Sequence, residues 1–392
     1  MRPTRRREAR SAKGTVARRD LLRLIGLGMV GLAAAGCGRN SFPAGASPSG
    51  TASGATPGSW DELVAAAKRE GKVVVSGSPD PKARPAIMNG FQKAFGIDLE
   101  YIGGNSSQLA ARLQAERASG QYTVDAGIAG SDSVYGSFFP NGWLDPLKQQ
   151  LILPEVADGS RWKMGRPWFR DPNGDTVLQI FQTVQQNLTL NTQYVAPQDI
   201  PTADALLDPK WKGKMCAYDP SVNGSGIAIG AAIYVAKGKD FVTKLYKGQN
   251  VVLSRDYQQV ADWVAHGTYP IGLAVPHSYL IEYTKAGVGI ANPELADAPD
   301  AVGAGFGLVF LWNHARHPNA ARLFANWIAS REGLTAYAQS NLQVPLRTDI
   351  DPTWIPPRMV PKPGVKYLDT YDYDFELTQR LGIRDFYASL LK

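Results

Sequence analysis

Hydrophobic runs of strand length alternate with amphipathic, helical stretches over most of the chain. Ser59 and Glu62 have the spacing of a capping box, which predicts that a helix begins there. Three β-branched or apolar runs follow, at 72–75, 97–102 and 125–128, and each leads into a small polar, glycine-containing loop. Strand, loop and helix units in series predict a mainly parallel sheet with helices on both faces.

The second half of the chain repeats this alternation. We predict further strands and helices at 176–184, 215–218, 227–235, 251–253, 256–265, 269–275, 301–311, 317–330 and 332–339. Residues 344–392 are first rich in proline and then in aromatic side chains, and we interpret them as a wrap on the second half of the fold. Because 392 residues exceed one ordinary core, we expect an α/β protein with two lobes.

The loops after the predicted strands hold the candidate binding residues. In open α/β sheets, ligands bind beyond the carboxyl ends of the strands. On that ground the first-lobe candidates are Ser76, Gly77, Ser78, Asn105, Ser106, Ser131 and Asp132. The second-lobe candidates are Asn223, Gly224, Ser225, Arg255, His277 and Tyr279. We expect the two sets to face each other across one cleft, although the same serines are also ordinary helix caps and Arg255 is equally typical of a solvated surface.

The stretch 204–230 carries the strongest local signal. A turn at Asp208 and Pro209 leads to the apolar run 215–218 and then to a glycine-rich loop that precedes a helix. Unpaired backbone N–H groups at such a helix start suit a small polar or anionic ligand. Arg255 follows another predicted strand and would supply a cation to an anionic ligand.

The segment LLDPKWKGKMCAYDPSVNGSG, at 206–226, resembles extracellular solute-binding proteins of bacterial ABC importers, in the branch that includes ferric-ion binders. The resemblance covers roughly residues 59–349. It implies the type II periplasmic-binding-protein fold: two lobes, each a mainly parallel sheet flanked by helices, with the ligand cleft between them. It also implies a small-molecule solute, an ABC importer permease as partner, a monomer, and neither catalysis nor a cofactor.

The resemblance implies how the chain is divided between the lobes. We expect 58–186 and 280–320 in the first lobe and 187–279 and 321–392 in the second. The hinges would then lie near 187–191 and 277–281. Ligand binding is expected to close the lobes about them.

Charge separates the first residues from the rest. Residues 1–36 hold nine of the 42 Lys and Arg and two of the 35 Asp and Glu, so the rest of the chain carries 33 of each sign. The net charge of +7 therefore belongs to the leader, and nucleic-acid binding is not indicated. The arginine-rich start and the apolar run 24–36 predict an export signal peptide. Arg18-Arg19 resembles a twin-arginine motif, with the ordinary secretory route as the alternative.

The residues after the leader predict a tether. Ala34-Ala35-Gly36-Cys37 resembles a lipobox, which implies lipidation of Cys37 and an extracytoplasmic protein anchored to the outer face of the cell membrane; an ordinary cleavage site is the alternative. The remainder of 37–57 is almost wholly Gly, Ser, Ala, Thr and Pro, which is typical of a flexible linker.

Signals for an enzyme or a metal site are weak. Gly224-x-Gly226-x-x-x-Gly230 only loosely resembles a dinucleotide fingerprint, and the chain has neither a GxxxxGK[ST] motif nor a GxSxG motif. The four histidines lack metal-site spacing, so we expect no metal site. Ferric binders of the family carry a Tyr-Tyr pair where this chain has His277-Ser278-Tyr279. We therefore predict a small organic or oxyanionic solute and keep an atypical ferric binder and an exported lipoprotein hydrolase as alternatives.

Overall fold

Helix α1 (Trp60–Glu70) opens the part of the chain that the computed structural model describes, residues 58–104 and 106–392. The predicted capping box is present: Ser59 Oγ accepts from the Glu62 N–H, and the Glu62 carboxylate accepts from the Ser59 N–H. The helix ends at Gly71, which adopts the left-handed conformation (φ 70°). Sequence reasoning therefore located the start of this element correctly.

The first lobe is built on a seven-stranded sheet. Its order is β2-β1-β3-β14-β6-β5, and β4 also pairs with β14. The strands are β1 (Lys72–Gly77), β2 (Asp98–Gly103), β3 (Ala126–Ala129), β4 (Leu144–Asp145), β5 (Trp168–Phe169), β6 (Leu178–Gln179) and β14 (Leu308–Trp312). Strands β1, β2 and β3 are parallel, as predicted, whereas β14 runs antiparallel to β3 and β6.

The second lobe is built on a five-stranded sheet with the order β10-β9-β11-β8-β12. Its strands are β8 (Leu188–Asn191), β9 (Met215–Tyr218), β10 (Val252–Ser254), β11 (Ile271–Leu273) and β12 (Ile290–Ala291). Strands β9, β10 and β11 are parallel to one another, and β8 is antiparallel to β11 and β12. All four residues of β9 are buried, which explains why a continuous apolar run marked it.

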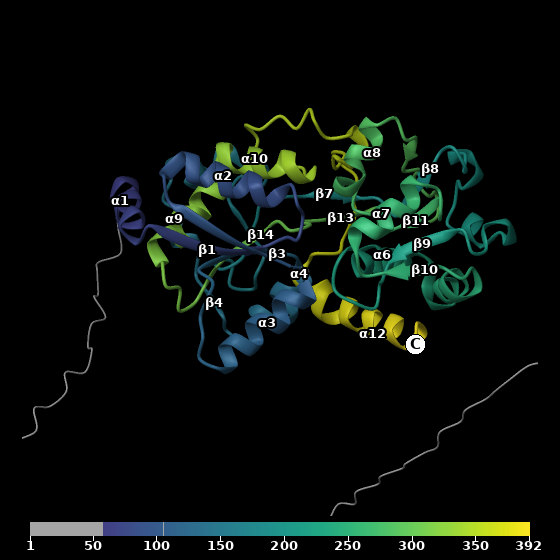
Figure 1. Ribbon diagram of the computed structural model, residues 1–392, viewed down its shortest axis with the longest axis horizontal. Helices are drawn as coiled ribbons and strands as arrows, with labels where there is room; N and C mark the ends of the chain where they lie inside the picture. Colours follow the sequence, from purple (N-terminus) through teal and green to yellow (C-terminus); the bar gives the residue numbers. More distant parts are fainter. Residues whose placement is uncertain (1–57, 105) are drawn as a thin grey trace, which may run out of the picture. The chain divides into compact units, whose positions relative to one another are not determined.

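Two short strands connect the lobes. β7 (Thr183–Gln185) leads from the first sheet to the second, and β13 (Ala301–Gly303) leads back. They pair antiparallel, and β15 (Leu368–Asp369) from the tail adds to β13. Figure 1 shows β7 and β13 between the two larger sheets. The predicted strand 301–311 is thus two strands, β13 and β14, which belong to different sheets.

This return crossing lies later in the chain than the sequence analysis placed it. Residues 277–280 form a 3₁₀ turn after β11, and α8 (Ile281–Lys285) and β12 follow while the chain is still in the second lobe, because β12 pairs with β8. The expected second hinge at 277–281 is corrected accordingly. Of the expected first-lobe segment 280–320, the part up to β12 belongs to the second lobe, whereas β14 lies in the first sheet as expected. The strand pairing that decides the matter joins residues about a hundred positions apart, beyond the reach of local patterns.

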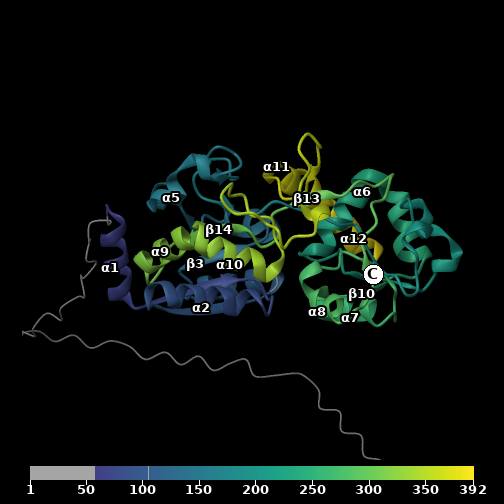
Figure 2. The ribbon, with the colours of Figure 1, turned by 90° about the horizontal axis from the view of Figure 1, so that it is seen from above.

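The helices divide between two buried cores. α1, α2 (Ala83–Phe95), α9 (Pro318–Ala329) and α10 (Arg331–Asn341) contribute buried side chains to the core of the first sheet. α6 (Ser225–Thr243), α7 (Tyr257–Ala265) and α12 (Leu381–Leu390) cover the second, as Figure 2 shows. α3 (Ser106–Ala118) lies on the other face of the first sheet. The assignment of 321–392 to the second lobe is therefore wrong for α9 and α10, whose apolar faces pack on the first.

The remaining helical segments are short. They include α4 (Ser131–Ser133), which continues into a π-helical turn at Val134–Phe138, α5 (Pro154–Ala157) and α11 (Tyr373–Phe375). None of the helices within residues 58–104 and 106–392 combines the length and the apolar character required to cross a membrane.

Gly226 is the position where the glycine-rich loop tolerates no side chain. A Cβ there would lie 2.5 Å from the Tyr218 carbonyl oxygen and 2.6 Å from that of Asp219, both of them backbone atoms. We expect Gly226→Ala to lower the free energy of unfolding by about 2 kcal/mol, because the end of β9 must shift to make room.

Gly382→Ala in α12 is the matched control. Nothing lies within 4 Å of its Cβ position, so the same change should be neutral or stabilise by up to about 1 kcal/mol. Urea unfolding of both variants makes the comparison. Equal stability of the two would contradict the tight packing at Gly226.

Candidate functional site

A cavity of ≈ 140 Å³ lies where both lobes and the crossing strands meet. The first lobe contributes Ser78, Asp80, Gly130 and Asp132, which follow β1 and β3. The second contributes residues that follow β9, β10 and β11, namely Gly224, Ser225, Ile229, Tyr257 and 274–279. Residues 183–186, Gly305, Phe306, Asn341, Gln343, Met359 and Tyr371 complete the lining. With roughly 10–15 Å³ per water-sized probe, the cavity has room for a solute of about ten non-hydrogen atoms.

Two carboxylates line the cavity from the first lobe. Asp80 is 6 % exposed, and its Oδ1 accepts from the N–H groups of Lys82 and Ala83 at the start of α2. Asp132 is 4 % exposed, and its Oδ1 accepts from the Ser133 N–H in the first turn of α4. Both helix starts favour negative charge, so the backbone itself holds these two acids at the cavity.

Tyrosines pack against one another on the second-lobe side of the cavity. The rings of Tyr218 and Tyr257 stack with centroids 4.1 Å apart, and Tyr279 lies tilted against Tyr257 at 5.5 Å. The Tyr257 hydroxyl accepts from the Ser225 N–H (3.3 Å), while Ser225 Oγ donates to the Ala274 carbonyl (3.0 Å). Burial, followed by the charge of nearby Tyr218, raises the pKa of Tyr257 well above its ordinary value, so this phenol is neutral.

The backbone of this wall is tightly fitted around the tyrosines. Gly224 has φ 133°, and a Cβ there would lie 2.6 Å from the Tyr257 hydroxyl. Ala274 also has a positive φ, 58°, an uncommon conformation for a residue with a Cβ. Both positions line the cavity, so the loops after β9 and β11 hold constrained shapes there.

His277 is the one histidine of the lining. Its Nδ1 is buried and has no hydrogen-bond partner among the described residues, and burial lowers its pKa below the ordinary 6.5. The ring is therefore neutral at pH 7 and offers a solute one nitrogen as donor or acceptor.

The lowered pKa of His277 predicts how stability depends on pH. A histidine that resists protonation in the folded state contributes stability above pH 6.5 that is lost as the pH falls. Thermal unfolding at pH 7.5 and pH 5.5 should therefore show a smaller acid destabilisation for His277→Gln than for the parent. His266→Gln is the control, because His266 is exposed and lies outside the cavity lining. If His277→Gln and the parent lose equal stability on acidification, the burial of this ring carries no such effect.

Six of the residues predicted from sequence line the cavity. They are Ser78, Asp132, Gly224, Ser225, His277 and Tyr279. They come from loops after β1, β3, β9 and β11, so strand ends in both sheets converge on one place. Whether these residues bind a solute stays a prediction.

Five others have structural partners outside the lining. Ser76 Oγ accepts from Trp312 Nε1 within the first sheet, and Gly77 lies against the Tyr101 hydroxyl. Ser131 is fully buried, where its Oγ donates to Glu376 and accepts from Arg380. Asn223 Oδ1 accepts from Arg384. Arg255 donates to Asp219 (2.9 Å) with its side chain 65 % exposed, so the structure does not bring it to the cavity.

The last three predicted residues cannot be placed in the same way. Asn105 and Cys37 lie outside the described residues, as do the export signal and the linker. For Ser106, only its backbone position as the first residue of α3 is described.

Sequence reasoning missed several lining residues. Asp80 stands two residues after a named serine, and Tyr257 two residues after Arg255, so the right loops were chosen but not the right side chains. Thr183–Gln186 and Tyr371 come from the crossing strand and the tail, whose approach to the cavity depends on long-range pairing.

Burial raises the pKa of the Cys216 thiol to about 12, which keeps it protonated and is typical of inert packing. In the described part of the chain, no group of three or more His, Cys, Asp and Glu residues is arranged to hold a metal ion.

Comparisons with known proteins agree with this architecture. Residues 86–357 match the model of the family described as bacterial extracellular solute-binding protein. An uncharacterized protein of Haemophilus influenzae is 24% identical over 337 residues, which are 78% of this chain and 88% of that protein.

Solved structures with the same fold include transport proteins. The substrate-binding protein of an ABC transporter from Agrobacterium tumefaciens has a TM-score of 0.65 at 18% identity, over 82% of this chain and 95% of that one. AfuA from Actinobacillus pleuropneumoniae, solved with fructose-6-phosphate bound, has a TM-score of 0.64 at 18% identity, over 81% of this chain and 98% of that one. Iron-bound HitA from Pseudomonas aeruginosa has a TM-score of 0.61 at 17% identity, over 81% of this chain and 99% of that one. Because all three structures are less than 20% identical to this chain, the likeness establishes the two-lobed fold and nothing about the bound solute.

Proposed function

Because the chain belongs to the bacterial extracellular solute-binding protein family, we propose that it captures a small polar solute between its lobes and delivers it to the permease of an ABC importer. The family's description supports a location outside the cytoplasm, and the transport proteins that share the fold support a role in solute uptake. Capture requires no chemistry on the solute, so we propose that the protein releases its ligand unchanged.

The convergence of strand ends on one cavity is the observation that carries this proposal. Ser78 and Asp132 approach it from the first lobe, and Ser225 and Tyr279 from the second. Because the two walls belong to different sheets joined by β7 and β13, a solute bound to both walls favours the closed arrangement of the lobes. Lys82 Nζ and Glu282 Oε1, 2.6 Å apart, also join the two lobes next to Asp80.

A thermal-shift screen tests this function. Phosphonates, carboxylates, amines, sugars and Fe(III) are each added to the purified mature protein, since a true ligand raises the unfolding temperature by mass action. A receptor returns the stabilising compound unchanged after prolonged incubation. Turnover of that compound would instead support the exported hydrolase.

Iron is the less favoured cargo. Ferric sites with oxygen donors rely on phenolates, and burial raises the pKa of Tyr257 and Tyr279 above the ordinary value. The neutral phenols of this cavity suit hydrogen bonding and stacking better than binding of a hard trivalent cation. Stabilisation by Fe(III) alone in the screen would reverse this preference.

The second part of the proposal concerns the cellular location of the protein. We expect residues 1–36 to be absent from the mature protein and Cys37 to carry the lipid that anchors it to the outer face of the membrane. Mass spectrometry of the native N-terminal peptide should show the added lipid, and Cys37→Ser should release the protein from sedimenting membranes. A Cys37→Ser protein that still sediments, together with an N-terminal peptide free of lipid, would contradict the anchor.

A further inference from the structure

The cavity of the proposed receptor has a one-sided charge. Among its lining residues, the formal charges are those of Asp80 and Asp132, and neither lysine nor arginine is present. His277, the remaining titratable nitrogen of the lining, is neutral at pH 7 because burial lowers its pKa. The two lining carboxylates come from the loops after β1 and β3 and stand on the first-lobe wall.

Two cations near these carboxylates form ion pairs with other acids. Arg380 forms its buried ion pair with Glu376 at 2.9 Å, and both side chains are about 2 % exposed or less. Lys82, two residues after Asp80, pairs with Glu282 at 2.6 Å. Because Lys82 is compensated by Glu282, the negative charge of Asp80 remains on the lining.

The opposite wall is aromatic. Tyr257 and Tyr279 line the cavity from the second lobe, and Tyr371 from the tail. Asp80 acts on this wall electrostatically, since burial and then the charge of Asp80 raise the pKa of Tyr279. A carboxylate on one side and phenol rings on the other form the environment in which ammonium groups bind, through charge-assisted hydrogen bonds and cation–π contacts.

We infer that the solute of this receptor is a small organic cation, an amine whose ammonium group is held by Asp80 or Asp132 against the tyrosines of the second lobe. This inference rests on the proposed function and names its substrate class. It differs from the anionic solute expected from sequence because Arg255, the cation assigned to that role, pairs with Asp219 outside the lining. The apolar lining residues Val184, Ile229, Val275, Phe306 and Met359 would cover the hydrocarbon part of the amine.

Titration calorimetry with charge-matched probes tests the inference. n-Butylamine, 1,4-diaminobutane and tetramethylammonium are the cations, butyrate and inorganic phosphate the anions, and glucose the neutral probe. We expect at least one cation to bind with one-to-one stoichiometry. Asp80→Asn or Asp132→Asn should weaken its binding about ten-fold to a hundred-fold, the range of a hydrogen bond to a charged group.

The substitutions separate charge from structure. Asparagine caps helices about as well as aspartate, so Asp80→Asn keeps the acceptor for the Lys82 and Ala83 N–H groups and removes only the charge. Asp208→Asn is the matched control, because Asp208 also caps a helical turn, through the Lys210 N–H, but does not line the cavity. Its affinity for the cation should equal that of the parent.

The outcomes distinguish the inference from the function beneath it. Binding of butyrate, phosphate or glucose with no binding of any cation overturns the substrate class and leaves the receptor standing. A cation whose affinity is unchanged in both Asp80→Asn and Asp132→Asn overturns the assigned carboxylates. If none of the six probes binds and no compound of the wider thermal-shift screen raises the unfolding temperature, both the inference and the receptor function are overturned.

Discussion

Arg380→Ala is expected to lower the free energy of unfolding by about 4 kcal/mol, because it leaves a buried carboxylate without its cation. Arg380 Nη1 donates to Glu376 (2.9 Å), to Ser131 Oγ (2.8 Å) and to the Thr370 carbonyl (3.0 Å). Its Nη2 reaches the Gly224 carbonyl at 3.5 Å. The tail therefore ties a loop of the first lobe to a loop of the second, and both loops border the cavity.

Arg384→Ala is the control for this prediction. Arg384 lies one helical turn further on, donates to Asn223 and is 30 % exposed, so its loss should cost less than about 1 kcal/mol. Urea unfolding of the two variants decides between them. Replacing both members of the pair, in Arg380→Leu/Glu376→Leu, should recover much of the lost stability. A single variant Arg380→Ala as stable as Arg384→Ala would show that the ion pair does not hold the tail.

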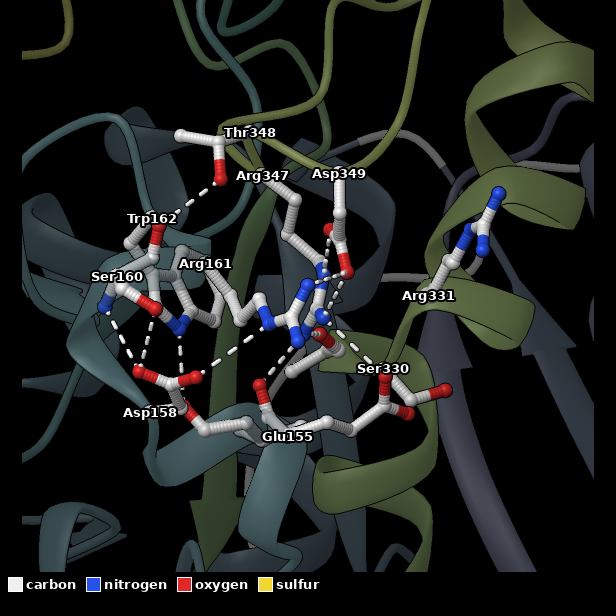
Figure 3. Close-up of polar contacts among 12 residues, drawn as sticks. Glu155, Asp158, Ser160, Arg161, Trp162, Ser330, Arg331, Arg347, Thr348 and Asp349 are labelled. Atoms are coloured by element: carbon white, nitrogen blue, oxygen red, sulfur yellow. Dashed lines mark hydrogen bonds and ion pairs between the residues drawn. The ribbon is translucent and has the colours of Figure 1, made fainter.

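Arg347→Ala should destabilise the first lobe by about 3 kcal/mol. Figure 3 shows the Arg347 side chain at the centre of a polar cluster that joins three separate segments. The fully buried guanidinium donates to both carboxylate oxygens of Asp349 at 2.8 Å, to the Glu155 side chain and carbonyl, and to the Ala329 carbonyl at the end of α9. Alanine would leave these acceptors unsatisfied, which is the costly way to break a buried pair.

Arg161 belongs to the same cluster and provides the comparison. It pairs with Asp158 at 3.3 Å and with Asp349 at 3.9 Å, and its side chain is 50 % exposed, so Arg161→Ala should cost less than about 1 kcal/mol. The hydrogen bonds from Arg347 also lower the pKa of Asp349. The stability that this carboxylate contributes is present above its unfolded pKa, near 4, and is lost as the pH falls through its folded pKa. The difference in the free energy of unfolding between Arg347→Ala and the parent should therefore become smaller in acid. A gap of constant size down to pH 2 would contradict this assignment.

Local signals were sufficient where one segment determines its own structure. The capping box at Ser59 and Glu62 and the buried run of β9 each rest on neighbours within a few residues, and both elements form as predicted. The loops beyond the parallel strands were also located correctly, because a strand that ends in a glycine-containing polar turn is visible in the sequence.

Long-range pairing was out of reach for the same reason. Ser131 has the composition of a ligand-binding loop, yet its hydroxyl bonds to Glu376, 245 residues later. Residues 301–311 form a continuous apolar pattern, but Gly305, with φ 54°, allows the chain to leave one sheet and enter another. The side chains that line the cavity are decided by such pairings, so the sequence predicted the loops of the site better than its residues.

Small-angle X-ray scattering of the mature protein, with and without a saturating solute from the thermal-shift screen, tests the central claim most directly. The claim is that both walls of the cavity bind one solute and that the lobes close on it about β7 and β13. We predict a smaller radius of gyration with solute than without, and a bound profile that matches the structure in which Lys82 and Glu282 meet. An identical radius in both samples would contradict capture between the lobes.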